Sequence, residues 1–282
     1  MKSLKLNTGY ELPMIGFGTY RILPEDCERV IHDAAEVGYR LFDTAPQYFN
    51  EEQIGNGIFQ CGVPRDELFI TSKIWFTMFE NDDPRRSVER SLKNMHTDYL
   101  DLVLVHWPFG NYYNAWRQME KMQEEGLIRS IGVSNFTAAQ LVDLIQYNKL
   151  TPAVNQIDTT LITQQHEIHR WMEKYGVTHQ AFAPFGQDRA NEMFELPQLK
   201  AIALAHDKTT RQIALRFTVQ RGIPVVPKST KKERMQQNLD VLNFSLTEEE
   251  MAVLYTLDTG KSLISNAGDP NCVEASQTWR KK

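Results

Sequence analysis

Polar side chains stand at the ends of several short apolar runs in this chain, and their types suit acid–base chemistry. They belong to Asp43, Lys73, His106, Ser134 with Asn135, Gln156, and Lys228 with Ser229. Taken singly, each has an ordinary structural explanation, such as a helix cap, a solvated charge or a buried histidine. Because they recur at the same end of successive runs, they predict one converging polar site.

Tyr48 adds a proton donor to this group, because it follows Asp43 by only five residues. A free tyrosine has a pKa of about 10, too high for easy proton transfer at neutral pH. An ammonium at Lys73 would favour the phenolate and lower that pKa, and Asp43 would hold Lys73 charged and oriented. With His106 as a second hydrogen-bond donor, the group would polarise a carbonyl and protonate the alkoxide that develops there.

The side chains supply no hydride, so a reduction at this site requires a cofactor. Ser134, Asn135 and Gln156 suit a carboxamide group. Phe182 lies where a flat ring can stack on its side chain. These residue types therefore predict that a nicotinamide lies beside the polar group.

A phosphate site is expected after the last predicted strand. Residues 227–230 lead from that strand into a helix start, a place where barrels often hold phosphate. Lys228 and Arg234 add more charge there than a pyrophosphate requires, which is consistent with a 2′-phosphate.

Short apolar runs alternate with segments of helical period along most of the chain, which predicts βα units and a parallel sheet. Strands are expected at Met14–Gly18, Arg40–Asp43, Leu68–Ser72, Leu100–His106, Ile128–Val133, Ala153–Gln156, Thr178–Phe182 and Ile223–Val226. Helices are expected near Pro24–Val37, Glu51–Phe59, Pro84–Met95, Tyr113–Glu124, Ala138–Asn148, Gln165–Tyr175 and Lys231–Leu239, with one long helical stretch ending at Gln220. Leu4–Leu12 predicts a short hairpin, and Thr247–Leu257 predicts an extra helix with a capping box.

The fold class expected from this order is α/β, a single (β/α)8 TIM barrel over residues 1–282 with an N-terminal hairpin plug and an extra C-terminal helix and tail. An open doubly wound sheet is the alternative that periodicity alone leaves open. The polar residues at the strand ends favour the barrel, because in a barrel they all converge on one rim.

Composition narrows the function classes. The chain has 282 residues, a hydrophobic fraction of 41% and a net charge of −5, and it shows no basic stripe that would track nucleic acid. No apolar run reaches the roughly 18 residues that span a bilayer. The cysteines Cys27, Cys61 and Cys272 are too widely spaced for a disulfide framework or a zinc site. We expect a cytoplasmic protein that binds neither nucleic acid nor membrane.

Two motifs point to other chemistry and are rejected. Gly16-Phe17-Gly18 resembles the start of a dinucleotide fingerprint, but position 21 is Arg instead of Gly. His166 and His169 are three residues apart, whereas the zinc motif requires a spacing of four. No metal is expected.

The motifs together resemble the aldo-keto reductase family over nearly the whole chain. The matching segments are Gly16 to Thr19, Asp43 to Ala45 with Tyr48 and Asn50-Glu51, Thr71 to Trp75, Asp98 to Leu102, His106 to Pro108, Gly126 to Arg129, Gly132 to Phe136, Asn155-Gln156, Gln212 to Arg216 and Pro227 to Ser229. The resemblance implies reversible hydride transfer between NADPH and an aldehyde or ketone. It also implies a monomer, which is the usual state in this family.

The resemblance assigns roles to individual residues. Tyr48 would be the general acid, supported by Asp43, Lys73 and His106. The cofactor-binding residues would be Thr19, Tyr20, Ser134, Asn135, Gln156, Phe182, Lys228, Ser229, Arg234 and Asn238. The chain departs from the family pattern at Phe182, where Tyr or Trp is usual, at Ala183 in place of Ser, at Thr160-Leu161 in place of His-Pro, and at Gln237 in place of an acidic residue.

Trp75, Trp107 and Phe109, with Phe49 beside them, are candidates for an apolar substrate wall; packing of the loops alone is the other explanation. The short segment after Phe109 resembles bacterial members that reduce small dicarbonyls or diketo sugar acids. The alternative functions are an NADPH-binding, redox-sensing regulatory subunit with little turnover, and a metal-dependent barrel hydrolase.

Overall fold

Eight parallel strands form the centre of the computed structural model, which describes residues 2–187, 191–264 and 266–280. The strands are β3 (Phe17–Gly18), β4 (Leu41–Asp43), β5 (Phe69–Ile74), β6 (Leu100–Val105), β7 (Ile128–Ser134), β8 (Val154–Asp158), β9 (Thr178–Phe182) and β10 (Val225–Val226). Each pairs with the next along the chain, and all pairs are parallel. This order makes the sheet a barrel and excludes the doubly wound alternative, in which the strand order reverses.

The barrel closes between its first and last strands. Ile15 forms a parallel bridge with Val225, and the amides of Gly16 and Gly18 donate to the carbonyls of Val225 and Pro227 at 2.8 and 3.1 Å. A Cβ atom on Gly18 would lie 2.8 Å from the Val226 carbonyl oxygen, so this seam requires glycine. The regular part of β3 is shorter than the expected Met14–Gly18, because only Phe17 and Gly18 pair with β4, whereas Ile15 forms a single bridge.

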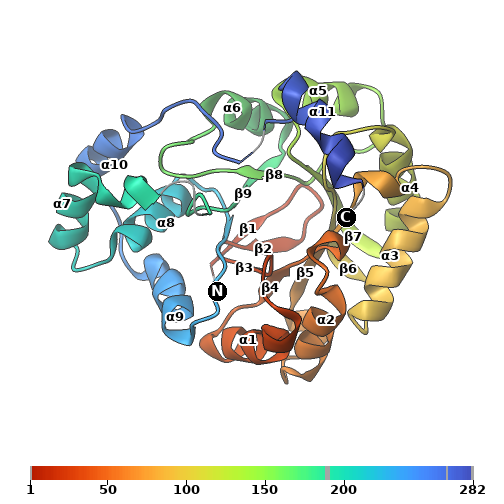
Figure 1. Cartoon of the computed structure of the whole chain (residues 1–282), viewed down its shortest axis with the longest axis horizontal. Helices are drawn as coiled ribbons and strands as arrows, with labels where there is room; N and C mark the ends of the chain where they lie inside the picture. Colours follow the sequence, from red (N-terminus) through yellow and green to blue (C-terminus); the bar gives the residue numbers. More distant parts are fainter. Residues whose placement is uncertain (1, 188–190, 265, 281–282) are drawn as a thin grey trace.

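Helices surround the strands, as Figure 1 shows in a view down the barrel. They are α1 (Pro24–Val37), α2 (Glu51–Gln60), α3 (Asp83–Asn94), α4 (Tyr112–Glu124), α5 (Ala138–Gln146), α6 (His166–Tyr175), α7 (Pro197–Ala205), α8 (Thr210–Gln220), α9 (Lys232–Asp240), α10 (Glu248–Tyr255) and α11 (Pro270–Trp279). The expected (β/α)8 barrel is confirmed. None of the helices in the described ranges is long and apolar enough to cross a membrane.

One expectation about the second half of the chain was wrong. The long helical stretch ending at Gln220 is two helices, α7 and α8, preceded by a short 3-10 segment at Asn191–Glu195; residues 188–190 lie outside the described ranges. The chain turns between the helices because Asp207 has a φ of 51°, and Thr209 then starts α8 with a capping box. The tail also contains α11, which the sequence analysis did not predict.

A hairpin plugs one end of the barrel, as expected. Its strands are β1 (Ser3–Lys5) and β2 (Glu11–Pro13), which pair antiparallel. Leu6 and Leu12 are buried in one cluster with barrel residues that include Leu102 and Val154. The apolar side of the hairpin therefore packs against the inside of the barrel.

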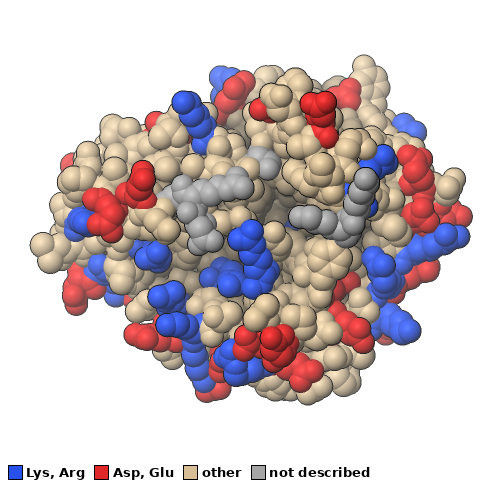
Figure 2. Space-filling model, viewed as in Figure 1, with Lys and Arg blue, Asp and Glu red and all other residues tan. Residues whose placement is uncertain are grey.

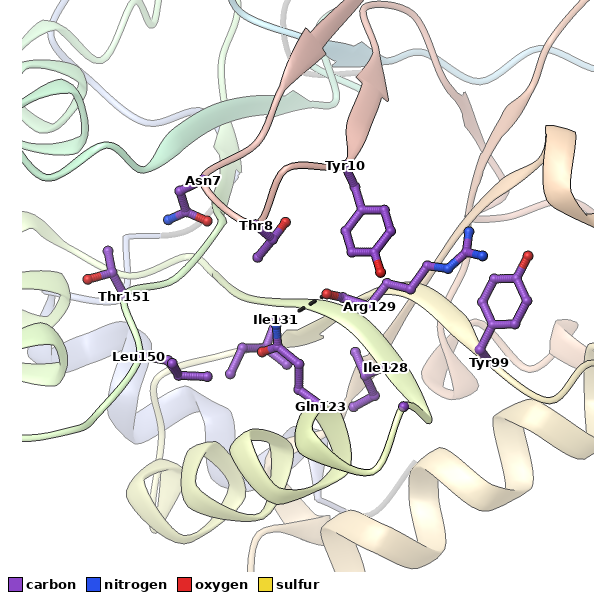
Figure 3. Close-up of a pocket in the computed structure, with 11 residues that line it drawn as sticks. Asn7, Thr8, Tyr10, Tyr99, Gln123, Ile128, Arg129, Ile131, Leu150 and Thr151 are labelled. Atoms are coloured by element: carbon purple, nitrogen blue, oxygen red, sulfur yellow. Dashed lines mark hydrogen bonds between the residues drawn. The ribbon is translucent and has the colours of Figure 1, made fainter.

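A pocket of about 780 Å³ lies beside the hairpin turn, at the end of the barrel where the strands begin (Figure 3). The Arg129 guanidinium forms its charged wall, 3.8 Å from the centre of the Tyr99 ring and 5.3 Å from that of Tyr10. Asp101 accepts from Arg129 at 3.0 Å and from Arg65 at 2.7 Å. Asp101 is thus shared by two cations and links residues before β5, in β6 and in β7, so these polar groups hold the hairpin end of the barrel together.

Candidate active site

The predicted acid–base group assembles at the opposite end of the barrel, where the strands end. Lys73, on β5, donates to the Asp43 carboxylate at 2.6 Å and to the Thr44 carbonyl at 3.0 Å. The Lys73 side chain is only 1% exposed, so this ion pair is shielded from water. Asp43 ends β4, and the register that pairs it with Thr71 brings the two strand ends together.

Tyr48 lies above this ion pair, on a 3-10 turn (Pro46–Tyr48) that directly follows β4. The Lys73 ammonium is 5.0 Å from the centre of its ring. The ring centres of His106 and Tyr20 lie 5.8 and 5.0 Å from that of Tyr48. The structure therefore brings together all four residues of the predicted acid–base group.

The net effect on the Tyr48 pKa is opposite to the expectation from sequence. Burial of the phenol raises its pKa above the usual value, and the Lys73 charge lowers it by less than burial raises it. The expectation considered the ammonium and omitted the loss of water around the hydroxyl. The phenol is therefore protonated at neutral pH.

His106 is neutral, because burial and the nearby Lys73 charge hold its pKa well below 6.5. A neutral imidazole carries one N–H. Its Nδ1 atom is buried and has no hydrogen-bond partner among the described residues. Since an unpaired buried N–H is costly, we assign the proton to Nε2.

The residues predicted for the carboxamide form a network beside Asp43. Gln156 donates through Nε2 to Asp43 at 2.7 Å and to Gln180 at 2.8 Å. Ser134 donates to the Gln156 carbonyl at 2.9 Å, and Asn135 donates to the His106 carbonyl at 3.0 Å. Buried hydrogen bonds thereby connect residues of β4, β7, β8 and β9 and the residue after β6, and they fix these polar groups in position.

Thr19 and Phe182 lie on the same rim. The Thr19 hydroxyl donates to the Asp43 carbonyl at 2.9 Å. Phe182 ends β9 and is half-buried, and it pairs in register with Asp158 of β8. The next residue, Ala183, has a φ of 46°, so the chain turns sharply after the ring.

The predicted phosphate site lies around the start of α9. Ser229 is buried, and its hydroxyl accepts from the Lys231 amide at 3.1 Å, which fixes the turn before the helix. Lys228 and Arg234 are exposed, and neither forms an ion pair within the described ranges. Asn238, one turn after Arg234, is buried. Figure 2 shows Lys and Arg side chains along the lower edge of the central hollow.

Aromatic residues form one side of the mouth. Trp107 and Phe109 stack with ring centres 5.4 Å apart, and Trp279 of α11 lies 5.2 Å from Trp107. Trp75 contacts His106 at 5.0 Å and so reaches the acid–base group directly. Phe49 is 65% exposed and belongs to the outer surface.

Three residues of this site were not identified from the sequence. Gln180 was missed although it pairs in register with Gln156, because its polar side chain lies in the middle of a strand. Trp279 was missed because α11 was not predicted. Asp158 follows Gln156 by two residues and therefore faces the same side of β8, a period-two signal that was available.

The rejected zinc motif holds no metal cluster in the structure. His169 lies against the buried His179, whose Nε2 is 2.8 Å from the Thr159 hydroxyl, and His166 lies 3.7 Å from Asp258. Over residues 2–187, 191–264 and 266–280, no group of three His, Cys, Asp or Glu side chains is arranged to hold a metal ion.

A parallel barrel with an acid–base group where its strands end is typical of a (β/α)8 enzyme. The Aldo/keto reductase family profile matches residues 14–258, and the chain belongs to this family. It is similar to a methylglyoxal reductase DkgA of Yersinia pestis, with 37% identity over 266 residues that cover 92% of this chain and 94% of the relative.

Solved structures agree with this assignment. An aldo-keto reductase from a Medee basin deep-sea metagenome library has a TM-score of 0.92 and 39% identity, covering 95% of this chain and 99% of its own. A Bombyx mori aldo-keto reductase in complex with NADP has a TM-score of 0.88 and 33% identity, covering 94% and 95%.

Proposed function

We propose that this protein reduces aldehydes and ketones to alcohols with NADPH, and that Tyr48 is the general acid. In the overall reaction one carbonyl, one NADPH and one proton give one alcohol and one NADP⁺. The observation that carries the proposal is the placement of a protonated phenol between a buried Lys73–Asp43 ion pair and a neutral His106.

The residues present fit the cofactor. Lys228 and Arg234 carry exposed charge beside a helix start, which suits the 2′-phosphate of NADPH. Ser134, Asn135 and Gln156 supply hydroxyl and amide groups for a carboxamide. We assign cofactor binding to these residues together with Thr19, Tyr20, Phe182, Ser229 and Asn238. When bound, NADPH supplies the hydride.

The protein side chains handle the proton. The Tyr48 hydroxyl donates its proton to the carbonyl oxygen as negative charge develops there. The N–H on Nε2 of His106 donates a hydrogen bond to the same oxygen and orients the carbonyl. The Lys73 ammonium, held by Asp43, stabilises the phenolate that remains on Tyr48.

The substrate class proposed is small carbonyl compounds, with α-dicarbonyls first. Trp107, Phe109 and Trp279 pack against one another and narrow the mouth from one side. The Yersinia pestis relative is named a methylglyoxal reductase. We expect Trp75, Trp107 and Phe109 to contact the substrate.

We also propose a cytoplasmic monomer. Cys27 and Cys61 are free thiols in the structure, which suits a reducing compartment. Light scattering on the purified protein tests the monomer, and localisation of a tagged chain tests the compartment.

The test is the loss of NADPH absorbance with a panel of carbonyls that includes methylglyoxal, aromatic aldehydes, diketo sugar acids and simple ketones. Tyr48→Phe should reduce turnover by about 10²- to 10⁴-fold, because it removes the proton donor and leaves the cofactor site intact. Fluorescence titration should show nearly unchanged NADPH binding. Tyr147→Phe, at a residue 72% exposed after α5, is the matched control and should behave as wild type.

Normal turnover in Tyr48→Phe would show that another group supplies the proton. If the wild type bound NADPH and reduced no carbonyl of the panel, a redox-sensing regulatory subunit would be the better description.

A further inference from the structure

Asp158 is a buried carboxylate at the rim that the proposed reaction does not use. It is the last residue of β8, and its exposed fraction is 4%. Alternation along the strand places it on the same face as Gln156, two residues earlier. It also pairs in register with Phe182. Its carboxylate therefore lies at the barrel mouth, beside the residues that we assign to the nicotinamide.

The Asp158 carboxylate connects three segments that are distant in the sequence. One oxygen accepts from the Ser262 hydroxyl at 2.8 Å and from the Leu263 amide at 3.3 Å. The other accepts from the side-chain amide of Gln165 at 3.1 Å, at the start of α6. The end of β8 thus holds the C-terminal tail by two hydrogen bonds made across more than a hundred residues of sequence.

The tail is attached at both ends of its course across the mouth. Before Ser262, the Thr259 amide donates to the Ile162 carbonyl at 3.0 Å. The Lys261 carbonyl accepts from the Thr163 hydroxyl at 2.8 Å. At the far end, Trp279 of α11 packs on Trp107 and Phe109. Asp158 therefore holds the tail between its first attachment and the aromatic wall.

We propose that Asp158 is a positioning residue for the substrate: by holding Ser262 and Leu263, it sets the position of α11 and of Trp279 at the mouth. This inference rests on the proposed carbonyl reduction, because it concerns the substrate side of the same site. It extends that proposal by naming the contact that keeps one wall of the substrate pocket in place.

The charge of Asp158 gives this contact a pH dependence. Burial is the largest cause that raises its pKa to about 6, and the donors from Ser262, Leu263, Ile264 and Gln165 lower it by less. The charged and titratable groups on the packed elements are His166, His169, Arg170, Glu167, Glu173 and Lys174 of α6, His179 of β9, Arg221 after α8, and Asp258 and Lys261 of the tail. Burial and hydrogen bonds are the strongest causes of the shift in the Asp158 pKa, and they act more strongly than these charges.

The direction of this pH dependence follows from the linkage between proton binding at Asp158 and docking of the tail. A tail that leaves the rim returns Asp158 to water, where its pKa falls toward 3.8. The docked tail therefore binds the proton more tightly than the released tail. Docking is strongest below pH 3.8 and weakens as the pH rises through about 6.

The experiment compares Asp158→Ala with Asp158→Asn. Asn keeps a carbonyl oxygen that accepts from Ser262 and Leu263, whereas Ala removes both hydrogen bonds. Loss of two hydrogen bonds should raise KM for an aromatic aldehyde about tenfold in Asp158→Ala, with kcat and the Kd for NADPH within about twofold of wild type. We expect KM of the wild type to rise between pH 5 and 7.5 as docking weakens. Asp158→Asn should restore KM and should abolish this rise.

A second readout does not depend on turnover. Amide hydrogen exchange in α11 should be faster in Asp158→Ala than in wild type and near wild type in Asp158→Asn. Asp143→Ala is the matched control, because it removes a half-buried carboxylate that accepts a hydrogen bond from Tyr113. It should leave exchange in α11 unchanged. Both readouts use the full chain.

The outcomes separate the two proposals. If Asp158→Ala changed neither KM nor exchange in α11, the positioning role would be wrong while carbonyl reduction stood. If Asp158→Ala lowered kcat and weakened NADPH binding as well as changing KM, Asp158 would be a general stabilising residue. The inference would then also fail. If the wild type reduced no carbonyl, but amide exchange in α11 was faster in Asp158→Ala as expected, the proposed function would fail. The anchoring contact of Asp158 would stand.

Discussion

At the scale of the residue, the acid–base group balances burial against charge. Burial keeps the Tyr48 phenol protonated, and in the reaction that we propose the Lys73 ammonium favours the phenolate that remains. The protonated phenol is the form that reduction requires. Because Lys73 is 1% exposed and paired with Asp43, water does not screen its charge at the phenol.

Buried histidines give a pH prediction at the same scale. Burial holds the pKa of His106 and of His179 well below 6.5. In the unfolded chain each takes up a proton near pH 6.5, so the unfolded state binds more protons and the free energy of unfolding falls as the pH drops below that value. His179→Gln, which keeps an amide for Thr159, should reduce this slope by up to about 1.4 kcal/mol per pH unit.

Urea unfolding between pH 7 and 5 measures the slope. His32→Gln, at an exposed position of α1, should leave it unchanged. Asp158 acts in the opposite direction, because its raised pKa gives stability that is lost as the pH rises through about 6. An unchanged slope in His179→Gln would mean that this imidazole is already charged in the folded protein.

At the scale of the element, we propose that the start of α9 determines which nicotinamide cofactor is preferred. Arg234 is exposed on the first turns of this helix and forms no ion pair within the described ranges. A charged hydrogen bond to the 2′-phosphate contributes about 1.5–3 kcal/mol, so Arg234→Ala should lower the NADPH-to-NADH ratio of kcat/KM by at least about tenfold. Steady-state kinetics with both cofactors measure this ratio, and Arg170→Ala on the exposed face of α6 is the control. A ratio that stayed at the wild-type value would remove Arg234 from the phosphate site.

Elements with strong local signals could be predicted from the sequence. Helix α1 and strand β9 begin and end at the expected residues, because Pro24 starts the helix and Gly38 ends it, and because Gly176 and Pro184 flank the strand. The capping box at Thr247 likewise located α10. The break between α7 and α8 was missed because it depends on one residue of positive φ, which a sequence without glycine there does not reveal.

The site could be predicted where it depends on strand ends and not where it depends on the tail. Asp43, Lys73 and His106 each follow an apolar run, so the barrel alone brings them together. The contact of Asp158 with Ser262 joins residues far apart in sequence, and no periodicity records such a pairing. The direction of the Tyr48 pKa was wrong for the related reason that burial is a property of the folded molecule.

At the scale of the whole molecule, stability and chemistry are placed at opposite ends of the barrel. Arg129→Ala removes the contact with Tyr99 and one hydrogen bond to Asp101, and Arg65 still neutralises the carboxylate. We expect a loss of about 1–2 kcal/mol in the free energy of unfolding, with kcat/KM unchanged. Denaturant unfolding and steady-state kinetics on the same preparation test this prediction. A large change in kcat/KM would mean that the two ends of the barrel are coupled.

Trp279 and the acid–base group come from distant parts of the sequence, and this distance has a consequence for how the gene can change. All four residues of the acid–base group lie before position 107, whereas Trp279 lies far downstream in α11. On the roles that we propose, a recombination event downstream of Leu257 would therefore change substrate selectivity and leave the codons of the acid–base group in place. A lineage can in this way explore new aldehydes without reinventing the proton donor, provided that each incoming tail brings a hydroxyl and an amide that Asp158 can hold.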